Sequence, residues 1–257
     1  MNKVLALAFV SASLLAQGNA STRAAWNRPV PPFQIIGNIY YVGAEGVASY
    51  LITTPKGHIL LDGALPETAP QIEKNIATLG FKLKDVKILL NSHAHYDHCG
   101  GLAELKKASG AQMIASRADS ITLEHGGLFP PVKVDRIIRD GETVELGGTK
   151  LTALLTPGHT PGCTTWTMPA LKVVFYCSTS VVEKLTPKMI AEYRQSFERL
   201  KTLPCDVFLG AHPGFFNMDE KRARMKPGAP NPFIDPAELH NYVLQSEQDF
   251  EQEVKKQ

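Results

Sequence analysis

Residues 91–101 read Asn-Ser-His-Ala-His-Tyr-Asp-His-Cys-Gly-Gly, which places three imidazoles and one carboxylate within six consecutive positions. In an extended segment, residues two apart point the same way, so His93 and His95 can address one point. Asp97 and His98 come where the chain turns through two glycines into a helix, and they can address a second point beside the first. The segment therefore predicts two adjacent metal sites.

Three apolar runs each lead directly into a loop that carries histidine. If the runs are strands that end at the same edge, their loops meet there although they are far apart in sequence. Each site then gains a third ligand from a distant loop. The pairs of run and histidine are Val86–Leu90 with His93, Leu151–Leu155 with His159, and Val207–Leu209 with His212.

Imidazole nitrogen and carboxylate oxygen are common zinc ligands, and a catalytic zinc has three protein ligands and one open position for water. We therefore expect two Zn²⁺ ions per chain and a hydroxide shared between them that acts as nucleophile near neutral pH. Asp97 would also hydrogen-bond that nucleophile. The first site consists of His93, His95 and His159, and the second consists of Asp97, His98 and His212.

Asp62 follows a buried-looking strand over 58–61 and leaves two interpretations open. Its carboxylate could orient a ligand imidazole from behind. Alternatively, it could only form the turn before Gly63. The remaining histidines, His58, His125 and His240, are best interpreted as ordinary polar residues.

The rest of the chain alternates short β-rich runs with amphipathic stretches. We expect strands over 34–36, 39–42, 48–53, 58–61, 86–90 and 111–115, and again over 144–146, 150–155, 164–168, 172–176 and 206–209. Helices are expected over 67–79, 102–108, 188–200 and 236–254. Strands in both halves with helices between them predict a layered α/β architecture, in which helices cover two packed sheets.

Composition excludes a collagen-like, coiled-coil or wholly disordered protein, and a nucleic-acid binder is not expected. The 257 residues are 44% hydrophobic and 20% charged, which is typical of a folded globular chain. The net charge of +2 is too small for a protein that binds the phosphate backbone of nucleic acid.

Residues 1–20 have the three parts of a secretory signal: Lys3, an apolar run over 4–16, and small residues up to Ala20. The apolar run is too short to span a bilayer, which needs about 20 residues. We expect cleavage after Ala20, a periplasmic protein with no membrane segment after cleavage, and one domain over 21–257. The Pro-containing stretch 21–32 is expected to be an extended arm.

The motif of residues 93–98, together with Leu-Leu-Asp-Gly at 60–63, resembles the metallo-β-lactamase superfamily. Residues 156–166, 203–213 and 231–236 are similar to the third subclass of class B β-lactamases. The resemblance implies an αββα four-layer sandwich, in which helices cover the outer faces of two mixed β-sheets. It also implies two zincs above the sheets and hydrolysis of β-lactam antibiotics, an activity that confers antibiotic resistance.

The stretch 173–180 separates this subclass from its relatives. Thioester and lactone hydrolases of the superfamily carry a metal-bridging Asp there, whereas this chain has no carboxylate in the stretch. The first β-lactamase subclass has a ligand Cys there but replaces the equivalent of His98 with Arg. Cys177 would be a ligand only with a one-residue slip, and Ser178 falls at the position that the third subclass predicts. The resemblance suggests that Ser178 and Ser180 receive the substrate carboxylate.

Cys163 and Cys177 lie opposite each other if 164–168 and 172–176 form a hairpin with 169–171 at its tip, which predicts a disulfide between them. Cys99 and Cys205 have no assigned partner.

Two other functions stay open: a thioester or lactone hydrolase on the same fold, and a non-catalytic zinc-binding protein. The latter would need closed four-ligand sites, and the open positions argue against it. We expect a monomer.

Overall fold

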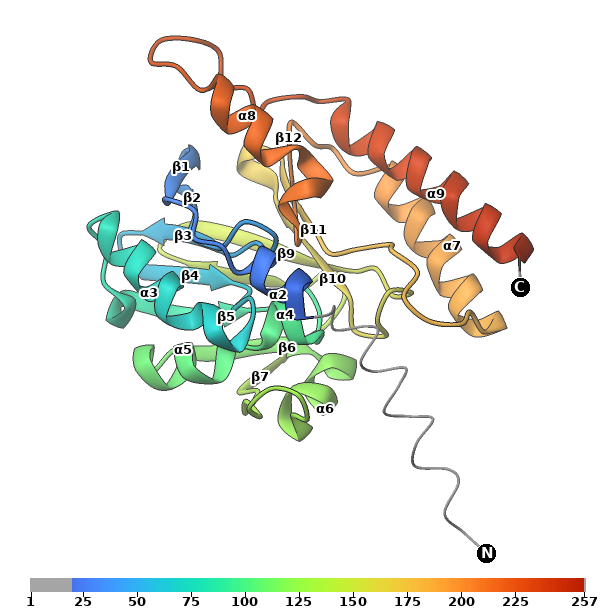
Figure 1. Ribbon diagram of the computed structural model, residues 1–257, viewed down its shortest axis with the longest axis horizontal. Helices are drawn as coiled ribbons and strands as arrows, with labels where there is room; N and C mark the ends of the chain where they lie inside the picture. Colours follow the sequence, from blue (N-terminus) through green and yellow to red (C-terminus); the bar gives the residue numbers. More distant parts are fainter. Residues whose placement is uncertain (1–19, 257) are drawn as a thin grey trace, which may run out of the picture.

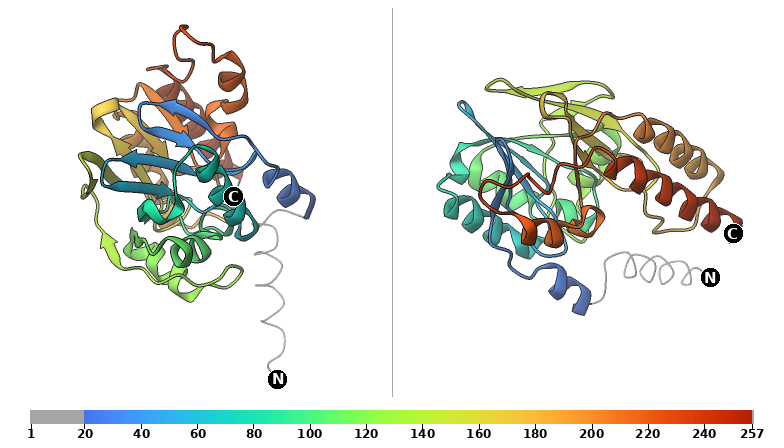
Figure 2. Two further views of the ribbon diagram at one scale, coloured as in Figure 1. Left: turned by 90° about the vertical axis from the view of Figure 1, so that its left-hand side faces the viewer. Right: turned by 90° about the horizontal axis from the view of Figure 1, so that it is seen from above.

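Two β-sheets lie face to face at the centre of the molecule, and helices cover the outer side of each (Figure 1). The structure, a computed structural model, describes residues 20–256. Two further views show helices on both sides of the paired sheets (Figure 2). Each sheet contains both antiparallel and parallel neighbours, so the predicted αββα sandwich of two mixed sheets is confirmed.

The larger sheet has its strands in the order β1-β2-β3-β4-β5-β6-β7. Strands β1 to β4 form an antiparallel meander, and β4 to β7 run parallel. Their bounds are β1 (Phe33–Ile36), β2 (Ile39–Tyr41), β3 (Tyr50–Thr54), β4 (Gly57–Leu61), β5 (Val86–Leu90), β6 (Gln112–Ser116) and β7 (Arg136–Ile138).

The smaller sheet has the order β12-β11-β10-β9-β8, with β12 parallel to β11 and the other neighbours antiparallel. Its strands are β8 (Thr143–Leu146), β9 (Thr149–Leu155), β10 (Thr164–Met168), β11 (Val173–Tyr176) and β12 (Val207–Gly210).

The hairpin of β10 and β11 differs by one residue from the predicted register. Met168 pairs with Val173 rather than with Lys172. The turn contains the 3-10 helix η3 (Pro169–Leu171) and also Lys172, whose φ of 47° is left-handed and takes it out of the strand.

The predicted disulfide between Cys163 and Cys177 is confirmed, with the Cα atoms 6.0 Å apart. Both cysteines lie just beyond the paired residues of β10 and β11, where the backbone is no longer held to the register. The bond therefore forms although the register from which it was predicted is shifted by one residue. Cys99 and Cys205 are buried thiols.

Helices α3, α5 and α6 pack on the larger sheet, and α7 and α9 pack together over the smaller one (Figure 1). The α-helices are α2 (Ala20–Trp26), α3 (Ala69–Thr78), α4 (Tyr96–Cys99), α5 (Leu102–Ser109), α6 (Arg117–His125), α7 (Pro187–Lys201), α8 (Met218–Arg224) and α9 (Glu238–Lys256). The other 3-10 helices are η1 (Pro66–Thr68), η2 (Leu83–Asp85) and η4 (Pro213–Phe216).

The inner ends of β4 and β5 are continuously apolar, over 59–61 and 88–90, because both faces of these strands are buried there. In β4, Ile59 and Leu61 belong to the core that contains residues of both sheets, whereas Leu60 belongs to the core beneath α3 and α5. The same alternation in β5 fixes the direction in which the chain leaves that strand toward His93.

The stretch 21–32 is not wholly the extended arm that was predicted, because α2 occupies its beginning. Helix α2 buries none of its side chains, so it leaves no apolar periodicity, and the prolines at 29, 31 and 32 dominate the pattern. Strand β7 and helices α6 and α8 were also not predicted.

The predicted signal peptide falls on residues 1–20, and 1–19 lie outside the described residues. Within the part that the structure describes, no helix has the length and apolar character needed to cross a membrane. Cleavage after Ala20 and the domain limits 21–257 stay predictions.

Candidate metal centre

The six side chains predicted as ligands come together where β5, β9 and β12 end. Strand β5 leads through residues 91–95 into the short helix α4, and β9 and β12 lead into the other two loops. Two compact groups result. The three-histidine group contains His93, His95 and His159, and the aspartate group contains Asp97, His98 and His212.

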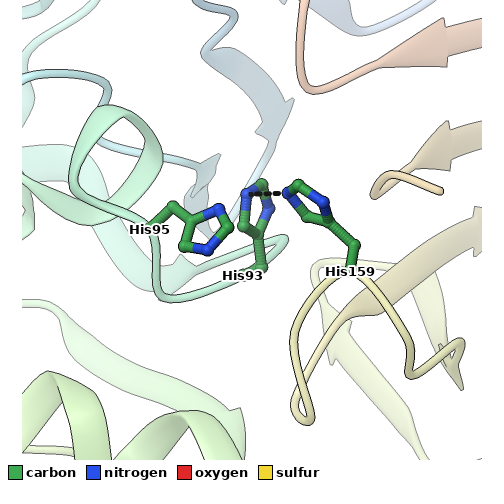
Figure 3. A group of neighbouring side chains, drawn as sticks. All are labelled: His93, His95 and His159. Carbon is green, nitrogen blue, oxygen red and sulfur yellow. Dashed lines mark hydrogen bonds between the residues drawn. The ribbon is translucent and has the colours of Figure 1, made fainter. Parts of the chain in front are cut away.

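In the three-histidine group the rings point toward one another, with His93 and His95 on one loop and His159 facing them from another (Figure 3). One ligand atom from each residue lies within 4.8 Å of the others. The Nε2 atoms of His93 and His159 are 3.2 Å apart.

In the aspartate group the Nε2 atoms of His98 and His212 are 3.1 Å apart. Oδ2 of Asp97 lies 3.2 Å from Nε2 of His98 and 3.5 Å from Nε2 of His212. The two groups adjoin, because the ring centroids of His93 and His98 are 4.3 Å apart.

These separations fit a tetrahedral ion. With Zn–N bonds of about 2.0–2.1 Å, two nitrogens on one zinc are about 3.3 Å apart. The four donor separations given above run from 3.1 to 3.5 Å. The aspartate group and the pair of His93 and His159 therefore have the spacing that zinc requires, and His95 offers a third nitrogen within 4.8 Å of that pair.

Backbone carbonyls orient two of the imidazoles. His159 donates from Nδ1 to the carbonyl of Ser180 over 2.7 Å, and His212 donates from Nδ1 to the carbonyl of Gly46 over 2.8 Å. A carbonyl can only accept, so each Nδ1 carries the proton. In the neutral ring, Nε2 then keeps its lone pair, which points into the group and is free to bind a cation.

Asp62 orients His93 through Ser92. The carboxylate accepts the amide proton of Ser92 over 2.6 Å and its hydroxyl proton over 2.7 Å. The Ser92 oxygen is 3.0 Å from Nδ1 of His93 and has no further proton to give, so Nδ1 donates to it. Nε2 of His93 therefore also presents a lone pair.

The structure supports the first interpretation of Asp62, because its carboxylate acts on His93 through Ser92. Its backbone is left-handed, with a φ of 65°, but residues 62 and 63 form no turn. Its carboxylate further lies 3.8 Å from Nδ1 of His98, a buried atom with no hydrogen-bond partner among the described residues.

Burial makes most of these imidazoles neutral at pH 7. It lowers the pKa of His95 and His212 to about 4 and that of His159 to about 3. These rings offer lone pairs to a cation without first losing a proton.

The pair of Asp97 and His98 behaves differently from the other ligands. Burial opposes the charge on both side chains, but the attraction between Asp97 and His98 outweighs burial. This attraction lowers the pKa of Asp97 and raises the pKa of His98. A cation bound beside this carboxylate would need the Nε2 lone pair of His98, so its binding competes with protonation of that ring.

The alternative of Cys177 as a ligand is excluded by its disulfide, because a metal binds the thiolate. Ser178 is buried, with 2% exposed, and its hydroxyl accepts the amide proton of Ser180 over 3.1 Å. Ser180 itself is exposed beside the three-histidine group. Contact of either serine with a substrate stays a prediction.

Several contacts at this centre were not predicted from the sequence. They include the Ser92 hydroxyl, the carbonyls of Gly46 and Ser180, the rings of Trp26 and Phe215, and the hydroxyl of Tyr193. The Trp26 ring lies 5.5 Å from that of His212 between centroids. The Tyr193 hydroxyl donates to the Ser180 carbonyl over 2.8 Å. A carbonyl leaves no signal in the residue type, and an isolated aromatic residue indicates only a core position.

The sequence matches the family described as the Metallo-beta-lactamase superfamily over residues 42–212, a range that includes all six candidate ligands. Among solved structures, the chain is similar to the subclass B3 metallo-beta-lactamase of Bradyrhizobium japonicum. The identity is 44% and the TM-score 0.86, over 90% of this chain and 96% of that one. It is also similar to the native metallo-beta-lactamase from Legionella gormanii, at 41% identity and a TM-score of 0.86, over 90% and 97%.

Among curated proteins, the chain is similar to the hydroxyacylglutathione hydrolase of Rhodopseudomonas palustris strain BisB18. The two are 32% identical over 151 residues, which make up 56% of this chain and 53% of that protein. The chain thus spans about half the length of the curated relatives it matches.

Proposed function

Because the chain belongs to the metallo-beta-lactamase superfamily, we propose that it is a zinc hydrolase that opens the amide bond of β-lactam antibiotics. Its solved relatives support this substrate class, since they are metallo-beta-lactamases matched at 41–44% identity over 90% of this chain. Antibiotic resistance is the corresponding biological role.

One observation carries the proposal: two adjacent groups each offer three protein donors that lie within 4.8 Å of one another. A zinc held by three protein ligands keeps one position for water or substrate, whereas a structural zinc is closed by four. This favours a catalyst over a protein that only stores zinc. The proposed content is two Zn²⁺ per chain, one in each group.

When bound, the ions would lower the pKa of a coordinated water toward 7 and polarise the lactam carbonyl. The chain itself orients the six ligand side chains toward the two metal positions. Asp97 would hold one ion and accept a hydrogen bond from the attacking water. Ser180, and Ser178 behind it, would receive the carboxylate of the substrate.

A thioester or lactone hydrolase is the second candidate, because the curated relatives are hydroxyacylglutathione hydrolases. The sequence of the loop after β11 argues against a thioester or lactone hydrolase. It carries cysteine, serine and threonine over 177–180 and no carboxylate to bridge two ions.

We also propose export to the periplasm as a monomer. The support for export is the three-part pattern of residues 1–20. Cell fractionation with the first 20 residues present or deleted tests this, and equal retention of both forms in the cytoplasm would contradict it.

The activity is tested with four substrates: a penicillin, a carbapenem, an acyl thioester and an acyl-homoserine lactone. Each is assayed before chelation, after chelation and after zinc is returned. We expect hydrolysis of both lactams, its loss on chelation and its recovery with zinc. Inactivity on both lactams, or higher kcat/KM for the thioester, would contradict the proposal.

A matched pair of variants assigns the activity to this centre. His159→Ala removes a member of the three-histidine group, whereas His240→Ala removes an exposed histidine of α9. We expect only the first to abolish lactam hydrolysis.

A further inference from the structure

The carbonyl of Ser180 accepts two hydrogen bonds, from Nδ1 of His159 over 2.7 Å and from the hydroxyl of Tyr193 over 2.8 Å. We propose that Tyr193 is a positioning residue, which holds this carbonyl so that His159 keeps its Nε2 atom aimed at the metal. The inference rests on the proposed function, because it assigns His159 to a zinc.

Tyr193 is a rigid support for the carbonyl. It lies in α7, its side chain is 1% exposed, and its ring centroid is 4.8 Å from that of Phe250 and 6.5 Å from that of Phe197. A tyrosine has only two side-chain torsions, and packing of this kind fixes both. Burial also raises the pKa of Tyr193, so its hydroxyl keeps its proton and remains a donor.

The ring of Tyr193 also shapes the loop before His159. Gly158 has a φ of 140°, and a Cβ atom there would lie 2.7 Å from Cγ of Tyr193. One turn further along α7, Ser196 donates to the carbonyl of Pro157 over 2.6 Å. Helix α7 thus contacts the loop at residues 157 and 158 and reaches His159 through Ser180.

The physical consequence concerns the proton on His159. The Ser180 carbonyl keeps that proton on Nδ1 and fixes the ring plane, which leaves Nε2 free for the metal. Ser180 lies in the loop after β11, and the residues on either side of it in the chain form no helix or strand. The Tyr193 hydroxyl ties this carbonyl to a helix, so its loss should free both the carbonyl and the ring. Loss of a partner that orients a ligand weakens metal binding by about 10–100-fold.

The test is the variant Tyr193→Phe, which keeps the ring against Gly158 and removes only the hydroxyl. The measurement is zinc affinity by competition with a chromogenic chelator, under conditions where urea unfolding shows the chain fully folded. We expect the affinity of one zinc to fall about 10-fold or more while the other is unchanged. An affinity equal to that of the original chain overturns the inference.

Tyr242→Phe is the matched control, because it removes the hydroxyl of a partly buried tyrosine, which bonds Ser246 within α9. An equal loss of zinc affinity in both variants would indicate general loosening and would also overturn the inference.

This experiment distinguishes failure of the proposed β-lactam hydrolysis from failure of the positioning role of Tyr193. A chain that binds two zincs, loses affinity on Tyr193→Phe and yet leaves lactams intact would contradict the proposed function and support the positioning role. A chain that binds no zinc would contradict both.

Discussion

Asp62 accepts two hydrogen bonds from Ser92, at 2.6 Å from its amide and at 2.7 Å from its hydroxyl. Because the hydroxyl proton is directed to Asp62, the Ser92 oxygen must accept the proton of His93 Nδ1, 3.0 Å away. A buried carboxylate two residues removed from the metal therefore decides which nitrogen of His93 is free to bind it.

Asp62→Asn should reverse this arrangement. An asparagine amide that faces the hydroxyl donates to it, and the Ser92 proton then turns toward Nδ1 of His93, which moves the ring proton to Nε2. If the asparagine amide is turned the other way, its NH₂ group faces the backbone N–H of Ser92, so two donors oppose each other. We expect zinc affinity to fall about 10–100-fold in chelator competition. Asp85→Asn, an exposed Asp→Asn change, is the control, and equal affinities in both variants would refute the relay.

His95→Ala should remove one ligand from the three-histidine group and leave the aspartate group intact. We expect bound zinc, measured by atomic emission after desalting, to fall from two ions per chain to one. Loss of a residue that only orients a ligand costs up to about 100-fold. Loss of the ligand itself should lower turnover by more than that. Near-normal turnover would show that the ligand assignment is wrong.

The disulfide should contribute to stability. Cys163 and Cys177 are 14 residues apart, and a loop of that size predicts about 3 kcal/mol of unfolding free energy. We expect urea unfolding of the double variant Cys163→Ala and Cys177→Ala to show a loss of that order. Reductant should destabilise the original chain and leave the double variant unchanged. Equal sensitivity of the two to reductant would contradict the assignment.

Asp119 should make the stability of the metal-free protein depend on pH. Burial raises the pKa of this carboxyl to about 7, and the Asn91 amide bonded to it over 2.8 Å only partly opposes the shift. An unfolded Asp titrates near 3.9, so between about pH 4 and pH 7 the folded chain binds more protons than the unfolded chain does. The unfolding free energy should therefore decrease as pH rises through this window and stay low above it.

Asp119→Asn should remove that contribution. We expect chelated wild-type protein to lose more unfolding free energy between pH 5 and pH 8 than the variant does, as measured by urea unfolding. The exposed Asp249→Asn serves as the control and should follow the wild type. An identical loss in all three proteins would contradict the prediction.

The ligands were predictable from the sequence, because four of them lie within six consecutive residues and strand alternation fixes where His93 and His95 point. His159 and His212 were predictable because each follows an apolar run, and strands that end at the same edge bring their loops together there. Helix α2 was not predictable, because a short helix in which no side chain is fully buried leaves no periodic pattern.

The residues that aim the ligands were harder to predict. The carbonyls of Gly46 and Ser180 belong to the backbone, which every residue type supplies. The two interpretations of Asp62 could not be separated without knowing that it is buried against Ser92. The hairpin register was wrong because the left-handed conformation of Lys172 is unusual for lysine and has no sequence signal.

Anomalous diffraction at the zinc absorption edge, from crystals of the zinc-loaded protein, tests the two-ion centre most directly. We predict two peaks. One lies about 2.0–2.1 Å from nitrogens of the three-histidine group, and the other lies equally close to donors of the aspartate group. A single peak, or rings of His159 and His212 turned away from the metal, would contradict the assignment.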